Sequence, residues 1–269
     1  MTAAMDWDDA FDNSGYTPGS DTFPDAWAAA AAATRDRLGD RLREVAYGDG
    51  DRERLDLIVP EGDSAGVVVF VHGGYWLRFD RRMWTHLAEG ALARGWTVAL
   101  PSYPLAPDAR IAAITQAVRQ AVIRVADEAA GPVRLVGHSA GGHLVARMAC
   151  EGVLPDAVAD RVERVVPVSG VHDLMPLCET LMNQRLRLDA EEAAAESPVR
   201  LRPRDGLAVT LWCGAAERPE FLRQTRMLEE RWLAAGADVG AVFEPGQDHF
   251  SVVDALRRPD TPLTEAVLL

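Results

Sequence analysis

The chain of 269 residues has 28 basic side chains, all of them arginine, against 41 acidic ones, which gives a net charge of −13 and an isoelectric point near 4.9. This acidic balance argues against nucleic-acid partners and against docking on anionic lipid, because both need a positive protein surface. The absence of lysine excludes Schiff-base catalysis, a P-loop lysine and a Ser-x-x-Lys acylation pair.

The cysteines and the first residues bear on the cellular compartment. Three cysteines lie far apart and form no C-x-x-C pair, so neither a disulfide framework nor a zinc cluster is expected. Residues 1–12 are acidic and lack the basic start and apolar core of a secretory signal, and the apolar run 28–33 is too short to span a bilayer. We therefore expect a reduced, cytoplasmic protein that is not associated with a membrane.

No repeat or low-complexity linker divides the chain, so we expect an N-terminal extension (residues 1–40) and one domain (residues 41–269). Pro24 and the alanines that follow predict a helix over 25–38, since proline is tolerated in a first helical turn. The aromatic residues of the extension would either cover a pocket as a lid or anchor the segment to the body. They are Phe11, Tyr16, Phe23 and Trp27.

The domain begins with two strand patterns, 42–47 and 54–59, separated by the turn signal Gly48-Asp49-Gly50. The alternation of Leu55, Asp56 and Leu57 predicts a half-exposed antiparallel pair at a sheet edge.

From residue 67 onward, short apolar runs typical of buried strands alternate with helical patterns. The predicted strands are 67–71, 96–100, 133–136, 164–168, 208–213 and 238–243, and the predicted helices are 83–94, 111–128, 140–151 and 221–235. This alternation predicts an α/β fold with a mostly parallel central sheet flanked by helices. In such sheets the functional residues lie on loops beyond the carboxyl ends of the strands.

The strand over 133–136 leads directly into Gly137-His138-Ser139-Ala140-Gly141-Gly142 and a helix. This is the G-x-S-x-G motif in its strand–turn–helix context, where small neighbours allow a turn that exposes the serine hydroxyl. A serine that only caps a helix would not require three flanking glycines. The motif predicts Ser139 as a catalytic nucleophile.

A serine nucleophile needs a base and an acid that orients the base. His249 follows the last predicted strand, and the chain order nucleophile, acid, base puts the base last. The histidines at 86, 138, 143 and 172 are expected to have packing or other structural roles rather than to act as the base. Glu217 lies four residues past the strand 208–213 and is the first candidate for the acid. The alternatives that remain open are Asp173, Asp248 and Glu220.

Acyl transfer also needs donors for the developing oxyanion. His72-Gly73-Gly74-Tyr75-Trp76 follows the strand 67–71, and the amides of Gly73 and Gly74 are expected to form the oxyanion hole together with the amide of Ala140. Tyr75 and Trp76 are then expected at the mouth of the substrate pocket. The next arginines form either a solvated turn or a positive patch for a carboxylate-bearing substrate. They are Arg78, Arg81 and Arg82.

Together these motifs resemble the α/β-hydrolase superfamily from about residue 42 to the C-terminus. Six segments of the chain are similar to the kynurenine formamidase (arylformamidase) and carboxylesterase group. They are HGGYW, GHSAGGHL, SGVHDL at 169–174, Ser197-Pro198, ERPEFLRQ at 217–224 and His249-Phe250. The resemblance implies that Glu217 is the triad acid and that residues 41–269 form an α/β-hydrolase catalytic domain without metal or cofactor. It also implies a small ester or aryl formamide as substrate, such as N-formylkynurenine, which would give formate and kynurenine.

Three other functions remain open from the sequence. The chain is alternatively a general short-chain carboxylesterase, or an enzyme that transfers the acyl group to an acceptor other than water. A non-catalytic binding protein of the same fold would typically lack one member of the triad, whereas this chain has a serine, a base and an acid in order.

Overall fold

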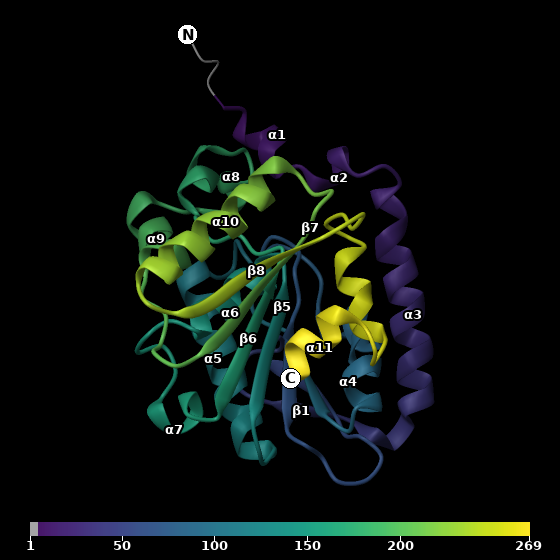
Figure 1. Cartoon of the computed structure of the whole chain (residues 1–269). Helices are drawn as coiled ribbons and strands as arrows, with labels where there is room; N and C mark the ends of the chain where they lie inside the picture. Colours follow the sequence, from purple (N-terminus) through teal and green to yellow (C-terminus); the bar gives the residue numbers. More distant parts are fainter. Residues whose placement is uncertain (1–4) are drawn as a thin grey trace.

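The computed structural model describes residues 5–269, which form an eight-stranded sheet covered by helices (Figure 1). The strand order is β1-β2-β4-β3-β5-β6-β7-β8; β1 and β2 are antiparallel to their neighbours, and the strands from β4 to β8 run parallel. The strands are β1 (Leu42–Ala46), β2 (Arg54–Ile58), β3 (Val67–Val71), β4 (Thr97–Pro101), β5 (Val133–His138), β6 (Val162–Val168), β7 (Ala208–Gly214) and β8 (Asp238–Glu244). The predicted mostly parallel α/β sheet is confirmed.

Helices cover both faces of the sheet (Figure 1). One face carries α5 (Ile111–Glu128), α6 (Ala140–Met148) and α10 (Pro219–Ala234), and the other carries α3 (Phe23–Leu38), η3 (Arg81–Ala88), α4 (Glu89–Ala93) and α11 (Pro262–Leu268). In β3, Val67, Val69 and Val71 join the first core, whereas Val68 and Phe70 join the second. Because successive side chains of a strand point to opposite faces, a strand covered on both faces needs an uninterrupted apolar run.

The remaining helical elements are short. They are α1 (Trp7–Phe11), α2 (Asn13–Tyr16), η1 (Ser20–Thr22), η2 (Gly39–Arg41), α7 (Asp156–Ala159), η4 (Met175–Glu179), α8 (Asn183–Leu186), α9 (Ala190–Ala195), η5 (Pro198–Arg200) and η6 (Val252–Arg257). The sequence did not predict these elements, because helices of one turn form through tertiary packing rather than through their own periodicity. The predicted helix 83–94 likewise divides into η3 and α4. Within residues 5–269, none of the helices is long and apolar enough to cross a membrane.

The predicted edge pair is correct in its pairing but wrong in its exposure. β1 is the edge strand, and β2 lies inside it with Asp56 fully buried. The Asp56 carboxylate accepts a hydrogen bond from Nε of Arg81 at 2.9 Å and another from Arg35 of α3. The alternation of Leu55, Asp56 and Leu57 therefore marks a buried ion pair under α3 and η3 rather than a solvent-facing side.

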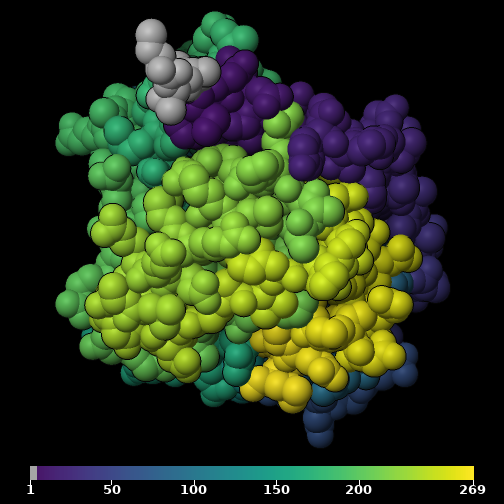
Figure 2. Space-filling view, turned by 45° about the horizontal axis from the view of Figure 1, so that its top comes forward, coloured from purple at the N-terminus to yellow at the C-terminus, as the bar shows by residue number. Residues whose placement is uncertain are grey.

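Residues 5–40 contribute to both the core and the carboxyl end of the sheet. Trp27 and Leu38 of α3 are buried in the second core. The segment α1–α2 lies at the end of the sheet where the parallel strands terminate, and in Figure 2 its purple residues lie against the green residues near α10. The rings of Phe11 in α1 and Phe221 in α10 are 6.1 Å apart, so this segment packs directly on the domain.

Candidate active site

Ser139 occupies a tight turn between β5 and α6. Its backbone angles are φ 56° and ψ −118°, a conformation that costs energy for an L-residue and is typical of a strained strand-to-helix turn. The turn is pressed against β3: a Cβ atom added to Gly141 would lie 1.9 Å from the carbonyl oxygen of Val71. Glycine is required here because the clash would be with backbone, which cannot rotate away.

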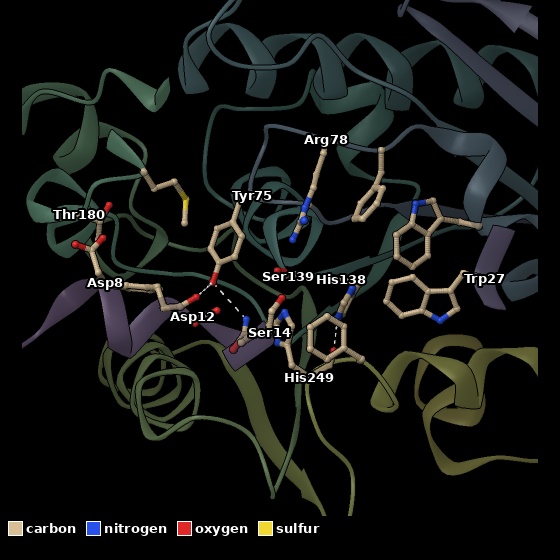
Figure 3. Close-up of a pocket in the computed structure, with 17 residues that line it drawn as sticks. Asp8, Asp12, Ser14, Trp27, Tyr75, Arg78, His138, Ser139, Thr180 and His249 are labelled. Atoms are coloured by element: carbon tan, nitrogen blue, oxygen red, sulfur yellow. Dashed lines mark hydrogen bonds between the residues drawn. The ribbon is translucent and has the colours of Figure 1, made fainter. Parts of the chain in front are cut away.

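His249 and Glu217 come from loops that follow β8 and β7, respectively. Nδ1 of His249 lies 2.7 Å from Oε2 of Glu217, and both side chains are buried. This contact fixes the orientation of the imidazole ring, which lies beside Ser139 in the same pocket (Figure 3). Of the three residues that the sequence assigned to nucleophile, base and acid, His249 and Glu217 are thus in contact, and Ser139 and His249 line one pocket at the carboxyl ends of the strands.

The second oxygen of Glu217 is also fully engaged. Oε1 accepts hydrogen bonds from the amide of Gly214 at 2.8 Å and from the hydroxyl of Ser169, at the end of β6. Burial raises the pKa of Glu217, but the electrostatic attraction of His249 and the hydrogen bonds from His249, Ser169 and Gly214 outweigh it and hold that pKa below its ordinary value. Glu217 is thus held as a carboxylate. The sequence reasoning did not assign a role to Ser169.

The other carboxylates considered for the acid make different contacts. Asp248 accepts from the amides of Phe250 and Ser251, and Glu220 is paired with Arg223 at 2.7 Å. The Asp173 carboxylate lies 4.0 Å from Arg200. Among residues 5–269, Glu217 is the carboxylate in hydrogen-bond contact with the imidazole of His249.

The glycine loop after β3 lies directly against Ser139. A Cβ atom added to Gly73 would be 3.0 Å from Cβ of Ser139, and Gly74 has a φ of +108°. Tyr103 fixes the start of this loop, since its hydroxyl donates to the carbonyl of His72 at 2.8 Å and its ring stacks on the His72 ring. Ala140 begins α6, where backbone amides have no acceptor within the helix. Gly73, Gly74 and Ala140 therefore lie next to Ser139 in the fold.

A pocket of about 230 Å³ opens over Ser139 (Figure 3). The lining residues are of two kinds. Polar residues of the N-terminal segment and of the loop near α8 line one side, and aromatic residues line the other. The polar ones include Asp8, Asp12, Asn13, Ser14 and Thr180, and the aromatic ones include Trp27, Phe79, Trp84 and Phe250. His138, which the sequence predicted as a packing residue, also lines the pocket, with Nε2 2.8 Å from the carbonyl oxygen of His249.

The two aromatic residues predicted at the pocket mouth have different positions. Tyr75 lines the pocket, and its hydroxyl donates to the carbonyl of Phe11 at 2.5 Å and accepts from Asn13. Trp76 does not lie at the mouth: it is fully buried, and its ring meets that of His143 edge-on at 5.2 Å. The prediction for Trp76 is wrong because the strongly bent backbone of the loop, with φ +57° at this residue, turns the indole into the core.

A second contact ties the N-terminal segment to the loop that carries Glu217. Both terminal nitrogens of Arg218 donate to the carboxylate of Asp9 at 2.9 Å, and its Nε donates to the carbonyl of Asp12 at 2.7 Å. The Arg218 guanidinium also lies 4.9 Å from the centre of the Tyr16 ring. No local pattern in the sequence predicts these contacts, since their partners are more than 200 residues apart along the chain.

The described residues also bear on the expectations for metal ligands and for cysteines. Within residues 5–269, no three His, Cys, Asp or Glu side chains are grouped so that they could hold a metal ion. Cys150, Cys178 and Cys213 are free thiols.

Comparisons with known proteins agree with this geometry. A sequence model described as the alpha/beta hydrolase family matches residues 68–269. The kynurenine formamidase of Salmo salar is 30% identical over 244 residues, which cover 86% of this chain and 82% of that protein, and the one of Danio rerio is 28% identical over 84% and 80%. A solved structure from Silicibacter sp. TM1040, provisionally named a thioesterase, is 48% identical with a TM-score of 0.95 and covers 99% of this chain and 100% of its own. An esterase of Pyrobaculum calidifontis, 17% identical with a TM-score of 0.70 over 91% of this chain and 90% of its own, shares the fold.

Proposed function

The chain belongs to the alpha/beta hydrolase family, and from this premise we propose that it is a serine hydrolase with Ser139 as nucleophile, His249 as base and Glu217 as acid. The observation that carries the proposal is the 2.7 Å contact of His249 with a buried, ionised Glu217 beside Ser139. A buried imidazole paired in this way can accept the serine proton, because the carboxylate stabilises the imidazolium that forms.

The proposed reaction has two halves. The hydroxyl oxygen of Ser139 attacks the substrate carbonyl while His249 accepts its proton, and the amides of Gly73, Gly74 and Ala140 stabilise the negative oxygen of the tetrahedral intermediate. His249 then gives the proton to the leaving alcohol or amine, which leaves an acyl group on Ser139. A water molecule, deprotonated by His249, then attacks this acyl-enzyme; the carboxylic acid leaves as His249 returns the proton to the oxygen of Ser139.

The substrate we propose is a small ester or an aryl formamide. The relatives of Salmo salar and Danio rerio are named kynurenine formamidases and match more than four fifths of this chain. The aromatic side of the pocket, with Trp27, Phe79 and Trp84, suits a flat leaving group, and the small volume suits a short acyl group. For N-formylkynurenine the products would be kynurenine and formate.

A second candidate is hydrolysis of other short acyl esters, including thioesters. It is favoured by the 48% identity with the Silicibacter protein that is provisionally named a thioesterase. The same acyl-enzyme chemistry would serve both candidates, since their substrates differ in the acyl group and in the leaving atom and not in the steps at Ser139.

We also propose that the N-terminal extension (residues 1–40) supplies a cover for the pocket. Phe11, Asn13 and Trp27 line the pocket, and Tyr75 and Arg218 bond the α1–α2 segment to the glycine loop and to the acid loop. The cover would thus help to shape the substrate site while residues 41–269 carry the catalytic groups.

The test compares kcat/KM for N-formylkynurenine, short-chain and long-chain p-nitrophenyl esters and a short acyl thioester. The first candidate requires N-formylkynurenine to be the best of these substrates. Ser139→Ala should abolish turnover of p-nitrophenyl acetate, whereas Ser14→Ala, which changes another pocket-lining serine, should not. Activity retained by Ser139→Ala would refute the assignment of the nucleophile.

A further inference from the structure

The three arginines that follow the glycine loop have separate environments. Arg81 is buried and is bonded to Asp56 and Glu44. Arg82 is exposed on the outer side of η3, with its guanidinium 3.9 Å from Glu44. Arg78 alone among them lines the pocket over Ser139. The positive patch that the sequence suggested is therefore reduced to a single guanidinium.

Arg78 has no acidic partner in the described part of the chain. Within residues 5–269, no carboxylate oxygen lies within 4.0 Å of its guanidinium, which instead lies 5.1 Å from the centre of the Phe79 ring. In Figure 3 the side chain extends into the pocket toward Ser139. In a chain with 41 acidic residues and a net charge of −13, an arginine without an acidic partner at this position has its donors available for a ligand.

The opposite side of the pocket carries fixed negative charge. Asp8 accepts from the amide of Leu181 at 2.7 Å, and Asp12 accepts from the amide of Gly15 at 3.0 Å. These bonds fix both carboxylates on the pocket side that faces away from Arg78 (Figure 3). A charged substrate would therefore meet the Arg78 guanidinium on one part of the pocket lining and two carboxylates on another.

We propose that Arg78 is a specificity-determining residue that binds a carboxylate on the substrate, so that anionic esters or formamides react faster than neutral ones of equal size. A guanidinium matches the two oxygens of a carboxylate with parallel hydrogen bonds. The acidic surface as a whole does not prevent this, because interactions between exposed charges more than about 8 Å apart are largely screened at physiological salt. This inference rests on the proposed function, since it requires turnover at Ser139.

The experiment measures kcat/KM for two matched pairs of probes, each with one anionic member. In the first pair, N-formylanthranilate carries a carboxylate on its leaving group and formanilide is the neutral counterpart. In the second pair, 4-nitrophenyl hydrogen succinate carries a carboxylate on its acyl group and 4-nitrophenyl butyrate is the neutral counterpart. Arg78→Gln should lower kcat/KM for the anionic probe of at least one pair about tenfold, mainly through KM, and change the neutral probes less than about twofold. Arg82→Gln, the matched control outside the pocket, should change neither.

Charge reversal at Arg78 and added salt should each change the preference for anionic over neutral probes. A residue with only a structural role would not produce either change. Arg78→Glu should reverse the order within the affected pair, so that the neutral probe becomes the better substrate. Raising the salt concentration to about 0.5 M should reduce the anion preference of the unmodified enzyme. Equal losses for anionic and neutral probes in Arg78→Gln, or no loss in either pair, would overturn the inference. Failure of the proposed function would look different: the unmodified protein would turn over none of the four probes faster than Ser139→Ala.

Discussion

Ser169 donates a hydrogen bond to Oε1 of Glu217, the carboxylate oxygen that does not face His249. Ser169 lies at the end of β6 with a φ of +51°, and Glu217 follows the neighbouring strand β7. The residue after the adjacent strand thus holds one oxygen of the carboxylate while the other contacts the imidazole. Ser169 acts through Glu217 and is in this sense a positioning residue.

Ser169→Ala removes one of the donors to Glu217 and should lower kcat for p-nitrophenyl acetate about tenfold with little change in KM, because a freer carboxylate orients His249 less well. The measurement is steady-state kinetics together with thermal melting. Ser197→Ala removes another buried hydroxyl, bonded to Leu174 and Ala193, and should leave kcat unchanged. An equal effect of both substitutions on kcat would contradict the positioning role.

Asp9→Ala removes the two hydrogen bonds to Arg218 that tie the α1–α2 segment to the acid loop. Asp9 is largely exposed, so the pair should be worth about 1 kcal/mol, which corresponds to an increase in KM of about fivefold if the segment shapes the substrate site. Limited proteolysis should also cut the segment faster. Asp21→Ala makes the same change of charge in η1 and is the control; a KM unchanged by Asp9→Ala would argue against a substrate-shaping cover.

Gly141→Ala should be severely destabilising. Its methyl group would lie 1.9 Å from the carbonyl oxygen of Val71, so either β3 or the turn that carries Ser139 must move. We expect a loss of at least about 3 kcal/mol in the free energy of unfolding, measured with urea, together with loss of esterase activity. Gly240→Ala in β8, where nothing lies within 4 Å of the added atom, is the matched control. Similar stabilities of the two variants would show that the turn is looser than described.

Buried histidines should make the fold sensitive to acid. Burial lowers the pKa of His72, His86 and His143 to about 4, and that of His138 and His172 to about 3, from an ordinary value of 6.5. Above pH 6.5 neither the folded nor the unfolded chain binds these protons. Below it the unfolded chain binds them and the folded chain does not, so stability falls as the pH falls from 6.5 toward 4.

The size of this effect is set by the number of protons taken up on unfolding. Each histidine contributes a slope of up to about 1.4 kcal/mol per pH unit in that window. Urea unfolding at a series of pH values between 8 and 5 should show a plateau above about pH 7 and a steep decline below it. A stability that stays constant down to pH 5 would mean that these imidazoles are protonated in the folded state.

The sequence alone determined those features that depend on neighbours along the chain. β3 and α5 have the predicted bounds, because an apolar run covered on two faces and a long amphipathic period are local properties. The turn at Ser139 was likewise readable, since the glycines that it needs are within three residues of the serine. The position of Glu217, four residues past the penultimate predicted strand, also placed it ahead of three other carboxylates, although the sequence offered no contact by which to choose.

Tertiary structure alone decided which polar groups meet. Asp56 was predicted at an exposed position and is buried under α3, Trp76 turns into the core, and Arg78 is separated from Arg81 and Arg82. Ser169 bonds to a residue 48 positions away, and Arg218 to one 209 positions away. The physical reason is that periodicity reports how much of an element is covered, whereas a hydrogen bond or an ion pair depends on a few ångströms between side chains that only the folded sheet brings together.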